Sequence, residues 1–211
     1  MPVNYTTLTA DKSTAGSIRR WVNYSQLDVE QVVLEAQALI YQTLRVREMR
    51  TEFSDLNLAP GAYSVALPAG FLDPIALQDK THDIEMKLFP ESNIVKRRSY
   101  DESGAMIRTI PFRYAIFDEK IQLECAYEEA TTLTLVGFKI PALLDADNQT
   151  NFLTNRYPHL LRVACLAQAY DFMSNNAKYQ SNLTLLSALI DKTNAESDLS
   201  YRDASFEVEI E

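Results

Sequence analysis

Two stretches with helical spacing enclose a central stretch in which apolar and polar residues alternate, and this order limits the folds open to the chain. In 29–44, apolar residues recur at the 3.6-residue spacing of a helix that buries one face. The same spacing returns in 177–193, at Tyr179, Leu183, Leu186 and Ile190. Residues 60–140 instead alternate and are broken by Pro and Gly, which is typical of strands and turns. We therefore expect helices near both ends of the chain and a β-rich stretch between them.

Local signals mark where the long helices begin. Asp28 is followed three residues later by Gln31, a pair that resembles a capping box, so a helix is expected to start there. Pro158 suits the first turn of a helix that runs to Met173, because the N–H that proline lacks is not needed at that position. The small residues of this second helix permit close packing against a neighbour.

Six short segments carry the alternation expected of strands: 62–67, 71–78, 84–89, 113–117, 120–126 and 131–136. Pro74 interrupts the second segment, which suits an edge strand or a bulge. Asp118 and Glu119 separate the fourth segment from the fifth, which predicts a tight hairpin. A short helix is expected after Pro90, and the basic run 96–98 is expected on a solvated face.

These patterns together predict an α+β fold: an antiparallel-type helical bundle with an inserted β-rich block and extended N- and C-terminal arms. A short helix through Val22, capped by Ser13 or Thr14, is expected after the polar lead-in 1–12. The expected divisions are an arm with the first bundle helices (1–59), the β-rich insertion (60–145), the C-terminal bundle helices (146–194) and an extended arm (195–211).

The charge of the chain disfavours general binding to nucleic acid. Asp and Glu number 29 against 20 Lys and Arg, a formal net charge of −9, which repels phosphate backbones. No apolar run approaches the roughly 18 residues of a membrane span, and the first residues lack the pattern of a secretory signal. We therefore expect no membrane partner. Cys125 and Cys165 are expected to be reduced, buried thiols.

The last residues alternate strictly between apolar and acidic side chains. Phe206, Val208 and Ile210 would lie on one face of a strand, and Glu207, Glu209 and Glu211 on the other. A lone terminal strand is not stable by itself. The pattern leaves three possibilities: the segment pairs with the chain's own sheet, it docks on a partner, or it is disordered.

The sequence contains no recognisable catalytic machinery. His82 and His159 have no partners at zinc-ligand spacing, and a total of five Gly argues against phosphate-binding loops. Paired acids suffice for glycoside hydrolysis, and the candidate pairs are Glu128–Glu129, Asp145/Asp147 and Asp118–Glu119. Such pairs are also common on solvated loops. We expect no enzyme activity, no cofactor and no metal.

Three stretches carry a resemblance to a known family: GSIRRWVNYSQ (16–26), LEAQALIYQTLRVREM (34–49) and TNFLTNRYPHLLRVACLAQAYDFM (150–173). They resemble the head-to-tail adaptor proteins of short-tailed bacteriophages, also called connector or head completion proteins. The resemblance implies a non-enzymatic virion protein, assembled in the bacterial host cytoplasm and located at the head–tail junction. Twelve copies would form a ring that joins the portal to the tail and extends the DNA channel.

The resemblance also implies partners and contact residues. The C-terminal arm would bind the portal protein through Phe206, Val208 and Ile210, and the β-rich block would contact the tail nozzle or tube. DNA would pass through the ring without sequence-specific binding. Trp21, Arg45, Arg47 and Arg50 are candidate subunit-interface residues. Alternatively, Trp21 anchors the core, and the arginines offset a helix dipole.

Two other functions fit the same sequence features. The chain would then be another tail or baseplate structural protein, or a virion-associated peptidoglycan hydrolase.

Overall fold

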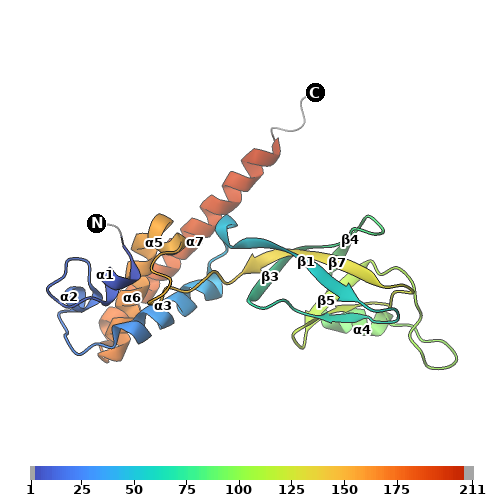
Figure 1. Cartoon of the computed structure of the whole chain (residues 1–211), viewed down its shortest axis with the longest axis horizontal. Coiled ribbons are helices and arrows are strands. Elements are labelled where there is room, and N and C mark those ends of the chain that lie inside the picture. Colours follow the sequence, from blue (N-terminus) through green and yellow to red (C-terminus); the bar gives the residue numbers. More distant parts are fainter. Residues whose placement is uncertain (1–2, 207–211) are drawn as a thin grey trace. The chain divides into compact units, whose positions relative to one another are not determined.

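The computed structural model describes residues 3–206, with side chains described for residues 3–198. The chain divides into two compact units, which are treated separately below (Figure 1). The helical unit comprises Met1–Glu48 and Pro141–Glu211, and the sheet unit comprises Met49–Ile140.

The helical unit is built around α6, against which α3 and α7 both pack. Its elements are α1 (Tyr5–Thr9), α2 (Ile18–Val22), α3 (Val29–Thr43), α5 (Phe152–Arg156), α6 (Pro158–Phe172) and α7 (Asn176–Phe206). Small buried residues of α6, such as Ala164 and Ala167, let its neighbours approach closely. Ile40 of α3 and Ile190 of α7 are buried in the same unit.

Polar side chains start the helices by accepting backbone N–H groups. Asp28 Oδ1 accepts from the Gln31 backbone at 3.2 Å, which confirms the predicted start of α3. Pro158 occupies the first turn of α6, as predicted. Asn4 caps α1 within the residues expected to be an extended lead-in, and Ser17, not Ser13 or Thr14, caps α2.

The long helix α7 overturns the prediction of an extended C-terminal arm beginning at residue 195. α7 contains 31 residues and is about 46 Å long at 1.5 Å per residue, and Ile190 is the last buried apolar residue in its described part. The described side chains that follow it, in 191–198, are mostly polar, so no apolar stripe marks this stretch as helical in the sequence. Residues 207–211 lie outside the described residues.

The sheet unit contains a seven-stranded mixed sheet with the order β1-β7-β3-β4-β5-β6-β2. Its elements are β1 (Arg50–Leu58), β2 (Ser64–Ala66), β3 (Phe71–Asp79), β4 (Ile84–Leu88), α4 (Glu91–Arg97), β5 (Arg113–Phe117), β6 (Lys120–Leu123) and β7 (Thr131–Lys139). A 3₁₀ turn, η1 (Arg47–Met49), precedes β1. Neighbouring strands are antiparallel except β4 and β5, which are parallel. The edge strands β1 and β2 contact each other, so the sheet is a nearly closed barrel.

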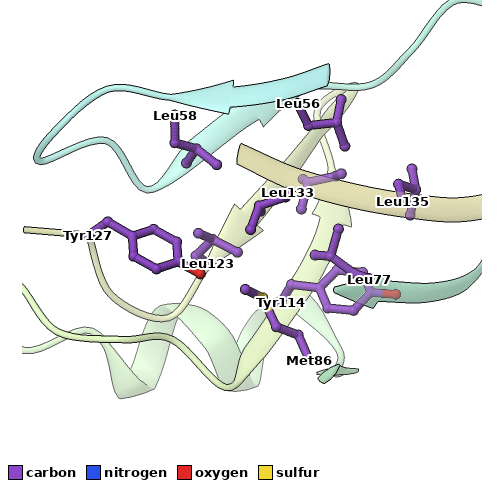
Figure 2. Close-up of a cluster of buried hydrophobic side chains, with 10 residues drawn as sticks. Leu56, Leu58, Leu77, Met86, Tyr114, Leu123, Tyr127, Leu133 and Leu135 are labelled. Atoms are coloured by element: carbon purple, nitrogen blue, oxygen red, sulfur yellow. The ribbon is translucent and has the colours of Figure 1, made fainter. Parts of the chain in front are cut away.

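The sheet curls around one apolar core, to which six strands contribute (Figure 2). Its buried members are Leu56, Leu58, Leu77, Met86, Tyr114, Ile121, Leu123, Tyr127, Leu133 and Leu135. Gly137 of β7 is also required by packing, because a Cβ there would lie 2.7 Å from the Asp73 carbonyl oxygen. β3 carries register shifts on both sides of Pro74, so the proline marks a bulge in an inner strand.

The predicted fold class, an antiparallel-type helical bundle with an inserted β-rich block and extended arms, is therefore wrong. The structure contains a nearly closed mixed barrel of seven strands, and the described parts of both arms contain helices. Apolar stripes show that a helix buries one face, but they do not show against what it packs. The predicted hairpin is confirmed: Asp118 and Glu119 both have positive φ, as its tight turn requires.

Candidate interaction surfaces

The arginines predicted at a subunit interface are used inside the chain. The Arg45 backbone N–H donates to Asn194 Oδ1 at 2.8 Å, and Nη1 of Arg45 donates to carbonyls at the end of α3. The Arg47 backbone N–H donates to Ser197 Oγ at 3.2 Å. The Arg50 guanidinium lies 5.8 Å from the centre of the Phe138 ring. An intermolecular role for these arginines stays a prediction.

Trp21 lies half-buried on α2, next to α6. The Arg162 guanidinium lies 5.7 Å from the centre of its ring, a favourable cation–π geometry. This contact supports the role of an anchor within the helical unit. The exposed part of the ring leaves the predicted subunit contact untested.

The residues predicted to bind the portal lie at the limit of the structure. Phe206 is the last residue of α7, while Val208 and Ile210 lie outside the described residues. Their role therefore stays a prediction from the sequence.

The sheet unit contains a hollow with a mixed apolar and polar lining that the sequence did not predict. We call it the 97–125 hollow; it has a volume of about 310 Å³ and is lined by Arg97, Ile107, Ile110, Phe112, Glu124 and Cys125, among others. Ile107 and Phe112 are 44% and 56% exposed. Large exposed apolar side chains around a hollow are typical of protein interaction sites. The sequence signal was weak because these residues show no regular alternation.

Local hydrogen bonds engage two carboxylates of the sheet unit, Asp101 after α4 and Glu124 in the lining of the 97–125 hollow. Asp101 accepts from the backbone and hydroxyl of Ser103 and from the backbone of Ala105, which closes the turn after α4. These bonds hold the pKa of the Asp101 carboxyl below its usual range. Glu124 accepts from Arg113 Nη1 at 3.0 Å and from the Phe112 backbone at 3.1 Å. Both carboxylates are therefore engaged locally.

Two basic side chains at the end of α4 remain available. Within residues 3–198, no hydrogen bond or ion pair engages the side chains of Lys96 and Arg97, which are exposed as predicted. The exposed Arg108 lies over Gly61. Arg98 is different, because Nη2 donates to Gln122 Oε1 at 2.6 Å and its guanidinium stacks on Tyr63. Of these basic side chains, Arg97 lines the hollow, as does the acidic Glu124.

A buried polar cluster lies elsewhere in the sheet unit, around Asp79. Its Oδ2 accepts from the Tyr127 hydroxyl and lies near His82 Nδ1, both at 2.6 Å, and its Oδ1 accepts from the backbones of Thr81 and His82. Burial favours the neutral acid, but these bonds together hold the pKa of Asp79 below its usual range. Because four groups already surround the carboxylate, the cluster serves to fix the β3–β4 turn.

Two of the three acid pairs considered as catalytic have a member that bonds to neighbouring residues, and the third lines a hollow. Asp145 Oδ1 accepts from the backbones of Asp147 and Asn148, and Asp118 pairs with Lys120 at 3.6 Å. Glu128 and Glu129 line a hollow of about 410 Å³ beside His82.

In the described part of the chain, no group of three or more His, Cys, Asp or Glu side chains is placed to hold a metal ion. Burial raises the pKa of Cys125 to about 11 and that of Cys165 to about 12. Among the described residues, no helix has the length and apolar character needed to cross a membrane.

Comparison with known proteins places the chain in a family. The family model described as SU10 adaptor protein matches residues 7–205. A search of curated proteins found no match. The chain belongs to the SU10 adaptor protein family and is therefore a structural adaptor of a bacteriophage virion. The phage adaptor class predicted from the sequence is confirmed.

Proposed function

We propose that this SU10 adaptor protein forms a ring that joins the portal to the tail at the head–tail junction and extends the DNA channel. The family match over residues 7–205 is the observation that carries the proposal. The resemblance of 16–26, 34–49 and 150–173 to head-to-tail adaptors supports the finer assignment and sets the expected ring at twelve copies.

A closed ring needs two different surfaces on each copy, because its side-to-side contacts are heterologous. The chain offers surfaces of contrasting chemistry. The described side chains of α7 beyond Ile190 are mostly polar, whereas the 97–125 hollow combines Ile107 and Phe112 with polar side chains. In this proposal the sheet unit faces the tail nozzle or tube, and the C-terminal segment faces the portal.

The acidic charge of the chain suits a channel that DNA must traverse. A net charge of −9 repels phosphate, so DNA would pass without sequence-specific binding and without adhering to the wall. The proposal includes no catalytic activity. A turbidity assay on purified peptidoglycan checks this point, since clearing by the wild-type protein would favour a hydrolase.

Electron microscopy of the chain mixed with the purified portal of the same phage tests the proposal. We expect an added ring of density coaxial with the portal, and none with the portal of an unrelated phage. Portal particles that carry no added ring would contradict the proposal. A ring that ignores the portal but binds another tail component would identify a different tail protein.

A further inference from the structure

We infer that a groove between α3 and α7 of one copy receives the surface that α2 and α6 form on the next copy. The inference rests on the proposed ring, because it names the side-to-side contact between neighbouring copies. Both surfaces belong to the helical unit, so no particular arrangement of the two units is required. They share no residue, as the heterologous contact of a closed ring demands.

The receiving surface is an apolar groove, which we call the α3–α7 groove. It has a volume of about 300 Å³, and its apolar lining consists of Leu39, Leu183, Leu186 and Ile190. Leu39 and Leu183 remain partly exposed there. Apolar side chains that stay open to solvent in a groove are typical of protein interaction sites. A second copy that covers the groove would remove them from water.

The docking surface, which we call the α2–α6 face, consists of Arg20, Trp21 and Arg162. α2 packs against α6, and the Arg162 guanidinium lies 5.7 Å from the centre of the Trp21 ring. Trp21 is half-buried, and both arginines are exposed. Trp and Arg are the residue types enriched at the energetic centres of protein interfaces. The face therefore offers the groove an aromatic side chain flanked by two cations.

The two surfaces carry opposite charges. Among the described residues that line the groove, Asp191 is the only charged one. Glu35 lies one turn before Leu39 on α3, a helix that contains no basic residue. On the other side, α2 contains no acidic residue, and α6 contains only Asp171, near its C-terminal end. Opposite potentials across an interface favour encounter and suppress wrong partners.

These charges are not neutralised within one copy. Among the side chains of residues 3–198, no ion pair engages Arg20, Arg162, Glu35 or Asp191. Nη1 of Arg20 donates to a backbone carbonyl at 3.4 Å, and Nη2 of Arg162 lies 3.1 Å from an imidazole nitrogen. Oε1 of Glu35 accepts from a neutral amide at 2.6 Å. All four charges are therefore open to an intermolecular partner.

Two bases that lie close in sequence to the groove residues are engaged locally. Lys192 pairs with Glu196 at 3.7 Å. The Arg45 guanidinium donates to the carbonyls of Tyr41, Gln42 and Leu44 at the end of α3. The negative charge of the groove is thus left for a partner, and the α2–α6 face of a second copy has the matching cations.

Nucleic acid is a poorer partner for the α2–α6 face. The net charge of −9 repels phosphate at longer range, and the half-buried Trp21 lies beneath a guanidinium already within its own copy. Competition by double-stranded DNA is nevertheless a direct check, because DNA would displace a second copy if it bound the same arginines.

Cross-linking between two differently marked copies tests the contact. One full chain carries Ser187→Cys in the groove, and the other carries Tyr24→Cys, directly after the C-cap of α2. Both positions are exposed, so the fold should tolerate each change. Both chains also carry Cys125→Ser, which leaves the fully buried Cys165 as the remaining native thiol.

The two marked chains are mixed, assembled on the portal of the same phage and treated with a short bismaleimide. We expect linked dimers that contain one copy of each chain. Either chain treated alone should stay unlinked, because each ring contact would then hold a single reactive thiol.

Charge reversal makes the result specific. Asp191→Lys in the groove-marked chain and Arg20→Glu in the other should each slow linkage by roughly fivefold, the size expected for an exposed charge pair. Combining the two reversed charges should restore most of the rate, which unfolded variants would not do. Lys139→Glu, at an exposed base of the sheet unit, is the matched control and should leave the rate unchanged.

Four outcomes would overturn the inference. These are absence of linked dimers in the mixture, linkage of either marked chain alone, a linkage rate that neither charge reversal lowers, and loss of linkage when double-stranded DNA is added. If the wild-type chain still forms a ring on the portal, only the contact has failed. If linked dimers form but no ring appears on the portal, the contact stands and the proposed function has failed instead.

Discussion

The helical unit and the sheet unit satisfy their buried polar groups in different ways. In the helical unit several side chains bond the backbone of distant segments: Gln37 bonds the Leu144 backbone twice, and Asn194 bonds Thr43 and Arg45. In the sheet unit, strand pairing satisfies most backbone groups, and one cluster around Asp79 is buried beneath the β3–β4 turn. Side-chain hydrogen bonds between distant segments are therefore spread over the helical unit, whereas in the sheet unit they are concentrated around Asp79.

Truncating the sheet core should have the largest effect on stability. Leu77 is fully buried among the leucines of neighbouring strands, so Leu77→Ala should lower the free energy of unfolding by about 3 kcal/mol. Urea denaturation measures the loss. Leu88→Ala, at a position 53% exposed, is the matched control; an equal loss there would show that the core does not dominate the sheet unit.

Removing the Asp79 carboxylate should have the second-largest effect on stability, because this carboxylate is the centre of the polar cluster that fixes the β3–β4 turn. Asp79→Ala leaves the Tyr127 hydroxyl and two backbone N–H groups without their acceptor, so we expect a loss of about 2 kcal/mol. Tyr127→Phe removes a single bond and should cost about 1 kcal/mol. Equal losses in the two variants would show that the cluster is not anchored by the carboxylate.

The same carboxylate predicts a pH dependence. Its folded pKa is depressed, so its contribution is fully present above the unfolded value of about 3.9 and is lost as pH falls through the folded pKa. Thermal melts between mildly acidic and strongly acidic pH should therefore show wild-type stability falling more steeply than that of Asp79→Asn. Parallel curves for the two proteins would contradict this role.

In the helical unit, replacing one polar side chain should lower the free energy of unfolding by less, because several side chains bond the backbone of distant segments there. Asn151 Oδ1 caps α5 through Leu153 and Thr154, and Nδ2 donates to the Tyr41 hydroxyl. Asn151→Ala should cost about 1 kcal/mol, and Asn151→Asp, which keeps the cap, should cost less. A loss in Asn151→Ala as large as that in Asp79→Ala would break the contrast between the units.

The smallest expected effect concerns the half-buried Trp21. Arg162→Gln removes the cation from above the indole ring and should cost about 0.5 kcal/mol by chemical denaturation. Arg162→Lys keeps a cation and should lose less. A cost above that of Asn151→Ala would show that this pair is a main anchor of the helical unit.

Features that depend on nearby residues could be predicted from the sequence. The Asp28 cap, the position of Pro158 and the turn at Asp118 and Glu119 all follow from local backbone requirements, and the structure contains each of them. The pairing of strands could not be read in the same way. β1 lies within 1–59, a range expected to hold an arm and helices, and its partner β7 is distant in sequence.

The interaction surfaces were harder to predict than the elements. The 97–125 hollow combines the last residue of α4 and residues after it with Glu124 and Cys125, which follow β6, and this juxtaposition leaves no periodic signal. Likewise, nothing local links Asp79 with Tyr127. The adaptor class was recognised from whole stretches of sequence, whereas the contact residues depend on the tertiary fold.

Native mass spectrometry of the protein, alone and mixed with the portal of the same phage, tests the central claim most directly. The adaptor account predicts a portal complex that carries one copy of this chain for each portal subunit. A chain that never adds to the portal, or a closed oligomer that is indifferent to it, would contradict the account and assign the protein to another part of the virion.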